Sequence, residues 1–190
     1  RHVPAECFYV RCRSLQNYLW LRGFVTQWGG SFHEIVSTVS LDYQVRGTLE
    51  RQLAVRPALA QELGLDDVIS DMALIGCDMF FRDGAALGVV FQAKDHRKLL
   101  AILGRQRQLV LAEVPGAEAQ TVIVDSRRVS LLSTPDNEVR SFYAIDGDCH
   151  LITSSRYIVE RFFEAGRGNR SLGELHEFRY ARQHMQAGQK

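Results

Sequence analysis

Four short apolar segments follow one another in the second half of the chain, with only two to five residues between neighbours. Each has the β-branched and aromatic content of a strand. The predicted strands are residues 120–125, 128–133, 139–145 and 149–153. Connections this short can join only antiparallel neighbours, because a parallel crossover needs about a dozen residues or more. We therefore predict an antiparallel four-strand meander, which constrains the fold more than any other feature of the sequence.

An Asp-Gly pair, Asp83-Gly84, separates two further apolar runs. The first run lies within residues 72–82, and apolar residues alternate with others over residues 85–93. Asp-Gly between two such runs is the strongest short-range indication of a β-hairpin. Residues 6–12 have the composition of one more strand.

Apolar residues at helical spacing indicate several helices, each preceded by a side chain that can cap it. The predicted helices begin near Ser14, near Asp95, at Ser154 or Ser155, and near Ser171. Strands and helices together predict an α+β fold, in which a largely antiparallel sheet (hairpin plus meander) carries its helices mainly on one face. No linker divides the chain, so residues 1–190 are predicted to form a single domain.

The charges of the chain are balanced. Its 190 residues include 23 basic and 22 acidic side chains, which gives a formal net charge of +1. A nucleic-acid-binding domain shows a basic excess, so no nucleic-acid partner is predicted.

No run approaches the roughly 18 apolar residues of a membrane-spanning helix, so no membrane span is predicted in this chain. Both ends look like cuts, and we expect the chain to be a piece of a longer protein.

The four cysteines are Cys7, Cys12, Cys77 and Cys149. None belongs to a C-x-x-C pair, which argues against zinc-ribbon and thioredoxin-like sites. Cys7 and Cys12 point to opposite faces of the predicted strand and so cannot bridge each other. Buried free thiols are the expected state. One disulfide between different strands stays open in an oxidising compartment.

No motif for catalysis or cofactor binding is complete. The P-loop, the nucleophile elbow and the paired histidines of zinc proteases are all missing, so neither a cofactor nor a metal ion is predicted. Two acidic turns remain, one with Asp136 and one with Asp146 and Asp148 followed by His150. Asp favours tight turns for conformational reasons alone, which is the interpretation we prefer. A dispersed site around these turns, with Ser141 as a nucleophile, is the enzymatic alternative.

Aromatic residues gather in the first predicted helix. Trp28 falls on the stripe expected to face the core, whereas Trp20 and Phe24 lie toward its flanks. Core packing is the ordinary role of such side chains, but an exposed tryptophan marks a partner or ligand surface. Trp20, Phe24 and Trp28 are therefore the candidate binding residues.

Three segments carry a family likeness: residues 3–11, 75–84 and 132–136. They resemble a group of uncharacterised bacterial proteins that is best represented in planctomycetes. Residues 142–181, with the ending strand, T-S-S, helix, G-x-x-S-L, F-x-x-A, are similar to a wider family of envelope-associated proteins of unknown function. The resemblance carries no established activity. It implies an extracytoplasmic setting and a non-enzymatic module within a larger protein.

The sequence thus favours a non-catalytic extracytoplasmic module, either in the periplasm or envelope or secreted, without deciding whether the chain is an enzyme. Such a module is a scaffold or a protein-interaction domain, whose partner is another protein or another domain of the same chain. Two alternatives stay open. One is a hydrolase-like enzyme with a dispersed site near Asp136 and residues 146–150, and the other is a ligand-binding module that uses Trp20, Phe24 and Trp28.

Overall fold

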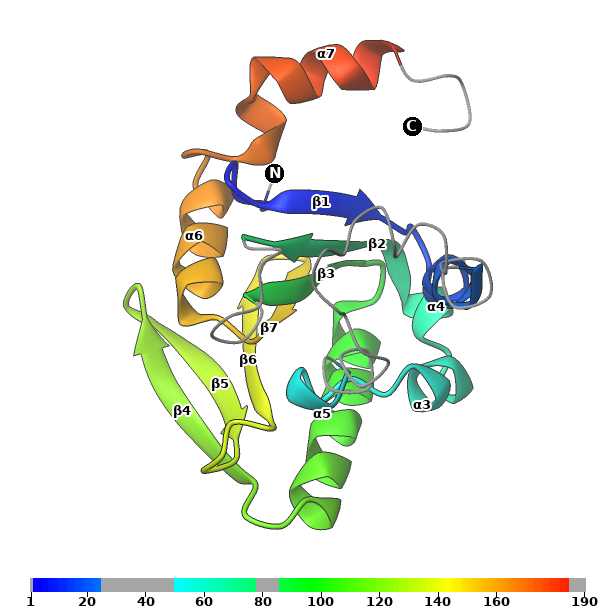
Figure 1. Ribbon diagram of the computed structural model, residues 1–190, viewed down its shortest axis with the longest axis vertical. Helices are drawn as coiled ribbons and strands as arrows, with labels where there is room; N and C mark the ends of the chain where they lie inside the picture. The colour runs from blue at the N-terminus through cyan, green and yellow to red at the C-terminus, as the bar shows by residue number, and fades with distance from the viewer. Residues whose placement is uncertain (1, 25–49, 78–85, 185–190) are drawn as a thin grey trace, which may run out of the picture.

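The computed structural model describes residues 2–24, 50–77 and 86–184. In these residues, seven strands form one sheet in the order β1-β2-β3-β7-β6-β5-β4 (Figure 1). The strands are β1 (Phe8–Arg11), β2 (Ile69–Gly76), β3 (Leu87–Ala93), β4 (Glu118–Val124), β5 (Arg127–Ser133), β6 (Arg140–Asp146) and β7 (Cys149–Thr153). Every neighbouring pair is antiparallel.

The predicted meander and hairpin are both confirmed as pairings of strands. β4, β5, β6 and β7 lie side by side in chain order, and β2 pairs with β3. The turn predicted at Asp83-Gly84 lies outside the described residues. Two pairings join these units into one sheet: β3 lies beside β7, with Phe91 opposite His150, and β1 adds to the free edge of β2. β1 and β4 are therefore the edge strands.

Several of the helices begin next to a side chain that caps them. Residues 15–24 are helical. The other helices are α3 (Pro57–Glu62), α4 (Leu65–Val68), α5 (His96–Glu113), α6 (Arg156–Gly166), the 3-10 helix η1 (Leu172–Glu174) and α7 (His176–His184). Asp95 accepts a hydrogen bond from the Lys98 N–H at the start of α5, and Ser155 accepts one from the Ile158 N–H at the start of α6. The α+β class is thus confirmed.

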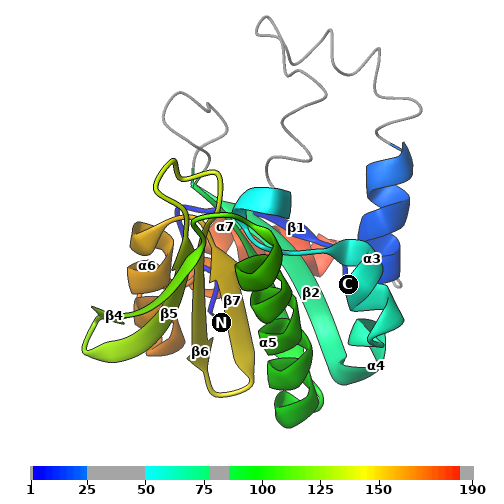
Figure 2. The ribbon, with the colours of Figure 1, turned by 90° about the horizontal axis from the view of Figure 1, so that it is seen from below.

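Most of the helices lie on one face of the sheet, as expected: helix 15–24, α3, α4 and α5 contribute to one core, and α6 covers the other face. α5 packs Leu99 against one face, in a core that also includes Phe91. α6 packs Phe162 against the other face, in a core that includes Leu151. The two helices lie on opposite sides of β6 and β7 (Figures 1 and 2). The reason is that all five residues of β7 are buried, and a strand that is buried on both sides needs a cover on each.

An N-terminal arm, residues 2–7, packs against the segment that follows α6. The Ala5 N–H donates to the Arg170 carbonyl at 2.9 Å, and the Leu172 N–H donates to the Val3 carbonyl at 2.8 Å. α7 then continues past β1 (Figure 1), where the Phe178 ring meets the Tyr9 ring edge-on at 5.9 Å between centroids. The two ends of the described chain thus stabilise each other.

None of the helices in the described part of the chain has the length and apolar content of a membrane-spanning segment.

Candidate functional site

Trp20 and Phe24 form a stacked aromatic pair on the outer side of helix 15–24. Their ring centroids lie 5.5 Å apart, and the ring planes differ by 19°. Trp20 is 68% exposed and Phe24 is 48% exposed, although tryptophan is highly buried on average. Stacked rings that remain open to solvent present a rigid apolar patch of the kind that partners bind. Trp28, the third candidate from the sequence, lies outside the described residues.

The first turn of this helix is fixed by two acceptors. The predicted cap, Ser14, accepts from the Asn17 N–H at 3.1 Å. The Asp66 carboxylate in α4 accepts from the Leu15 N–H at 2.6 Å and from the Gln16 N–H at 3.1 Å. A carboxylate at a helix N-terminus binds otherwise unpaired N–H groups and also faces the positive end of the helix dipole. The aromatic pair therefore lies on an element that the fold holds in place.

The inner side of the same helix lines an apolar cavity of about 240 Å³. Tyr18 and Leu21 line it from the helix, and Leu74 lines it from β2. At its edge the Glu50 carboxylate accepts from the Tyr18 hydroxyl at 3.2 Å and from the Arg22 guanidinium at 2.6 Å. Burial, aided by the Glu50 charge, raises the pKa of Tyr18 to about 12. The Tyr18 hydroxyl is therefore a donor at neutral pH, and the cavity has one polar edge.

Asp136 lies in the β5–β6 turn, and its carboxylate serves that turn. Its Oδ1 accepts from the Thr134 hydroxyl at 2.6 Å and from the Glu138 N–H at 3.0 Å. The hydrogen bond from Thr134 is the main cause that lowers the pKa of Asp136. These bonds are typical of a turn stabilised by an Asp side chain.

Asp146 lies at the other end of β6, so the length of that strand, roughly 20 Å, separates the two acidic turns. The Asp146 carboxylate accepts from Arg127 at 2.7 Å and lies 3.1 Å from Nε2 of His2. Asp148 is exposed in the β6–β7 turn. The structure therefore does not bring Asp136 close to Asp146 or Asp148.

The His150 side chain is 0% exposed and lies on the face of the sheet opposite to the Asp146 side chain. Its Nδ1 lies 2.6 Å from the Tyr143 hydroxyl, and its Nε2 lies 3.0 Å from Nδ1 of His96 at the start of α5. Burial lowers the pKa of His150 to about 4, and the neighbouring His96 adds to this effect. His150 is therefore neutral at pH 7, and both of its nitrogens already have partners.

Ser141 is buried on the α5 side of β6. Its hydroxyl donates to the Leu53 carbonyl at 2.7 Å and accepts from Arg107 at 2.8 Å. Ile145 is the residue of β6 that pairs with His150, so Ser141 lies four residues away from it, roughly 13 Å along the strand. The residues of the hydrolytic alternative are thus spread over both faces and both ends of the sheet.

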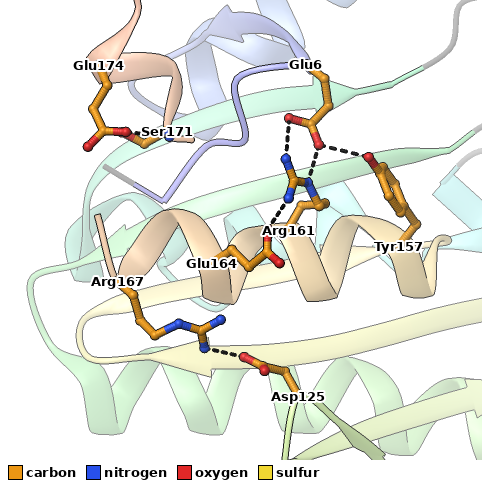
Figure 3. Close-up of polar contacts among 8 residues, drawn as sticks. All are labelled: Glu6, Asp125, Tyr157, Arg161, Glu164, Arg167, Ser171 and Glu174. Carbon is orange, nitrogen blue, oxygen red and sulfur yellow. Dashed lines mark hydrogen bonds and ion pairs between the residues drawn. The ribbon is translucent and has the colours of Figure 1, made fainter. Parts of the chain in front are cut away.

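Charged side chains attach the N-terminal arm to α6 (Figure 3). Glu6 accepts from the Arg161 guanidinium and, at 3.0 Å, from the Tyr157 hydroxyl, and Arg161 also pairs with Glu164. The hydrogen bond from Arg161 is the main cause that lowers the pKa of Glu6. These side chains pair with one another, so the cluster holds the arm in place.

Two of the four thiols lie side by side, an arrangement that the sequence leaves open. The sulfur atoms of Cys7 and Cys77 are 3.0 Å apart, and all four cysteines are free thiols. Cys12 instead contacts the Val10 carbonyl, and Cys149 donates to the Gln92 side chain at 2.9 Å. The contact between Cys7 and Cys77 depends on the pairing of β1 with β2. The sequence gives no sign of this pairing, because a long segment separates the two strands.

Within residues 2–24, 50–77 and 86–184, no three His, Cys, Asp or Glu side chains lie close enough together to hold a metal ion. Comparisons of the chain with protein families, with curated proteins and with solved structures find no match. The stacked aromatic pair is therefore the candidate functional site that the geometry itself supports.

Proposed function

We propose that this chain is a non-catalytic interaction module that binds a protein partner, or another domain of its own protein, through Trp20 and Phe24. The observation that carries the proposal is the exposure of a stacked aromatic pair on a helix that is fixed at its first turn. Tryptophan is enriched among the few residues that dominate binding energy at interfaces. Rings that are already ordered before binding also lose little conformational freedom on binding.

The positions of the candidate catalytic groups support a non-catalytic role. A nucleophile must lie within hydrogen-bonding reach of its base, and a base must reach the proton that it removes. Ser141 is hydrogen-bonded to Arg107 and Leu53, and both nitrogens of His150 are occupied. Among the described residues, these groups are not arranged as the hydrolase-like alternative requires.

The same proposal places the module outside the cytoplasm, in a bacterial envelope. This location is the one that the resemblance of residues 142–181 to envelope-associated proteins implies. The test is to fuse the full-length natural protein to alkaline phosphatase, which becomes active only after export. Active phosphatase is the expected result, and an inactive fusion of full length would contradict the location.

Photo-crosslinking tests the binding surface directly. A photoreactive phenylalanine analogue replaces Trp20 in the full-length protein in its own cells. Tyr180 on α7, which is 59% exposed, is the matched control position. We expect one crosslinked polypeptide from position 20 that position 180 does not give, and Phe24→Ser should reduce its yield. Equal labelling at the two positions, or none at position 20, would contradict the proposal.

A small apolar ligand is the second candidate, favoured by the cavity of about 240 Å³ behind Tyr18 and Leu21. This volume is below the ~300 Å³ at which drug-sized sites begin, so the ligand would be small. The chain has two tryptophans, Trp20 and Trp28, both in the first part of the sequence. Intrinsic fluorescence that shifts when a short-chain fatty acid is titrated, and stays constant in Leu21→Arg, is the result expected for this candidate. Fluorescence that does not respond would contradict it.

A further inference from the structure

Cys7 and Cys77 lie directly opposite each other on neighbouring strands. β1 pairs with β2 in a register that sets Phe8 against Gly76. Extending this antiparallel register by one residue places Cys7 against Cys77. Both side chains then point to the α6 face, where Cys7 belongs to the buried core and Cys77 packs against it.

The backbone places the pair at the closer of the two kinds of position in an antiparallel ladder. The Cys77 N–H donates to the Ala86 carbonyl at 3.1 Å, toward β3 and away from β1. Facing residues without mutual backbone hydrogen bonds have Cα atoms about 4.5 Å apart. A disulfide spans Cα separations of about 4.4–6.8 Å. The two sulfur atoms are 3.0 Å apart, so a bond of about 2.05 Å needs an approach of only about 1 Å.

The two thiols differ in their surroundings. Cys7 is 5% exposed, whereas Cys77 is half-buried and reachable from solvent. The hydrogen bond between the thiols lowers the pKa of Cys77 and raises that of Cys7, and burial raises the pKa of Cys7 further. The Arg161 charge favours the Cys77 thiolate, while the Glu6 charge opposes it. Cys77 is therefore the thiol that ionises first and meets a reagent first.

We propose that Cys7 and Cys77 form a reversible disulfide by thiol–disulfide exchange with a low-molecular-weight or protein disulfide. The Cys77 thiolate attacks one sulfur of the oxidant, which breaks the oxidant's S–S bond and releases one thiolate. Cys7 then loses its proton and attacks Cys77 Sγ, which releases the second thiolate and forms the intramolecular bond. The two protons lost by the cysteines are taken up by the two released thiolates. The cysteine pair is oxidised, and the disulfide reagent is reduced to two thiols.

The bond would fasten the N-terminal arm and edge strand β1 to the end of the neighbouring strand β2. In the reduced chain this attachment rests on hydrogen bonds and on the Glu6–Arg161 pair (Figure 3). A covalent link between residues far apart in sequence limits the unfolded chain and so raises thermal stability. For a chain of this size the expected increase in Tm is roughly 5–10 °C.

The experiment equilibrates the full chain with mixtures of reduced and oxidised glutathione, blocks the remaining thiols by alkylation and maps the peptides by mass spectrometry. The expected result is a peptide pair linked through Cys7 and Cys77, lighter by two hydrogens, with the Tm raised as above. Cys77→Ser should abolish both effects. Cys12→Ala and Cys149→Ala are the matched controls, because each removes a buried thiol and should keep both effects.

Several results would overturn the proposal. These are the absence of the link after equilibration with oxidised glutathione alone, a dominant link that involves Cys12 or Cys149, and stable glutathione adducts on Cys7 and Cys77 separately. If Cys7→Ala fails to fold, the half-buried Cys77→Ser variant still decides the question. A link that forms equally well in unfolding concentrations of urea would also overturn it, since the fold would then contribute nothing to the pairing.

Discussion

Polar side chains buried between α5 and the sheet form two hydrogen-bonded groups at the scale of single residues. In one, His150 joins Tyr143 to His96. In the other, Ser141 joins Arg107 to the Leu53 carbonyl. A buried polar atom without a partner costs free energy, so these paired side chains position α5 and residue 53 against β6 and β7. His150 and Ser141, which were candidate catalytic residues in the sequence, therefore serve as fixed structural contacts.

The neutral state of His150 makes the stability of the protein depend on pH. Its pKa is about 4 in the folded chain, against about 6.5 in the unfolded chain. Between these values only the unfolded chain binds the proton, so the free energy of unfolding decreases as the pH falls from about 6.5 to about 4. The decrease amounts to roughly 3 kcal/mol. Urea unfolding from pH 7.5 to 4.5 should show a much weaker pH dependence in His150→Gln. The exposed His176→Gln is the control, and an unchanged dependence in His150→Gln would contradict the assignment.

Removal of the Ser141 hydroxyl tests the second group. Ser141→Ala leaves the Leu53 carbonyl without this donor and removes one acceptor of Arg107, so we expect a loss of about 1–3 kcal/mol in the free energy of unfolding. Ser70, whose hydroxyl bonds to the Gln92 carbonyl at an exposed position, is the matched control. Ser70→Ala should change stability by less than about 0.5 kcal/mol. If chemical denaturation showed the same change in the free energy of unfolding for both variants, the buried hydrogen bonds of Ser141 would not contribute to stability as expected.

At the scale of elements, local features of the sequence are good predictors and long-range pairings are not. The Asp95 and Ser155 caps and the meander could be predicted because each depends on neighbours a few residues away. The pairing of β1 with β2 and of β3 with β7 joins distant segments, so no local pattern specifies it. The position of α6 depends on these pairings, because they create a second buried face of the sheet, which α6 covers.

The docking of helix 15–24 depends on Asp66, a contact between distant segments. Asp66→Ala removes the acceptor for the Leu15 and Gln16 N–H groups, and we expect a loss of about 1 kcal/mol or more. The neighbouring Asp67→Ala, at an exposed position in the same first turn of α4, is the control and should have little effect. Urea unfolding followed by tryptophan fluorescence measures both variants. Equal stability of the two would mean that Asp66 does not hold the helix.

At the scale of the whole molecule, the sequence named Trp20 and Phe24 but could not show that they are exposed. Helical spacing puts them on the flank of the buried stripe, and only the packed fold shows what covers that flank. The sequence could not separate Asp146 from His150 either, since they are close in the chain and lie on opposite faces of the sheet. In the folded molecule the aromatic pair therefore remains a candidate binding site, whereas the residues of the acidic-turn site lie far apart.

The affinity of the polypeptide captured at position 20 tests the proposed function most directly. Calorimetric titration compares the natural chain with Trp20→Ala and with Asp148→Asn, an exposed change on the alternative site. We expect Trp20→Ala to weaken binding at least tenfold, about 1.4 kcal/mol, and Asp148→Asn to leave the Kd within about twofold. Undiminished affinity of Trp20→Ala together with loss of binding in Asp148→Asn would contradict a module that works through its aromatic pair.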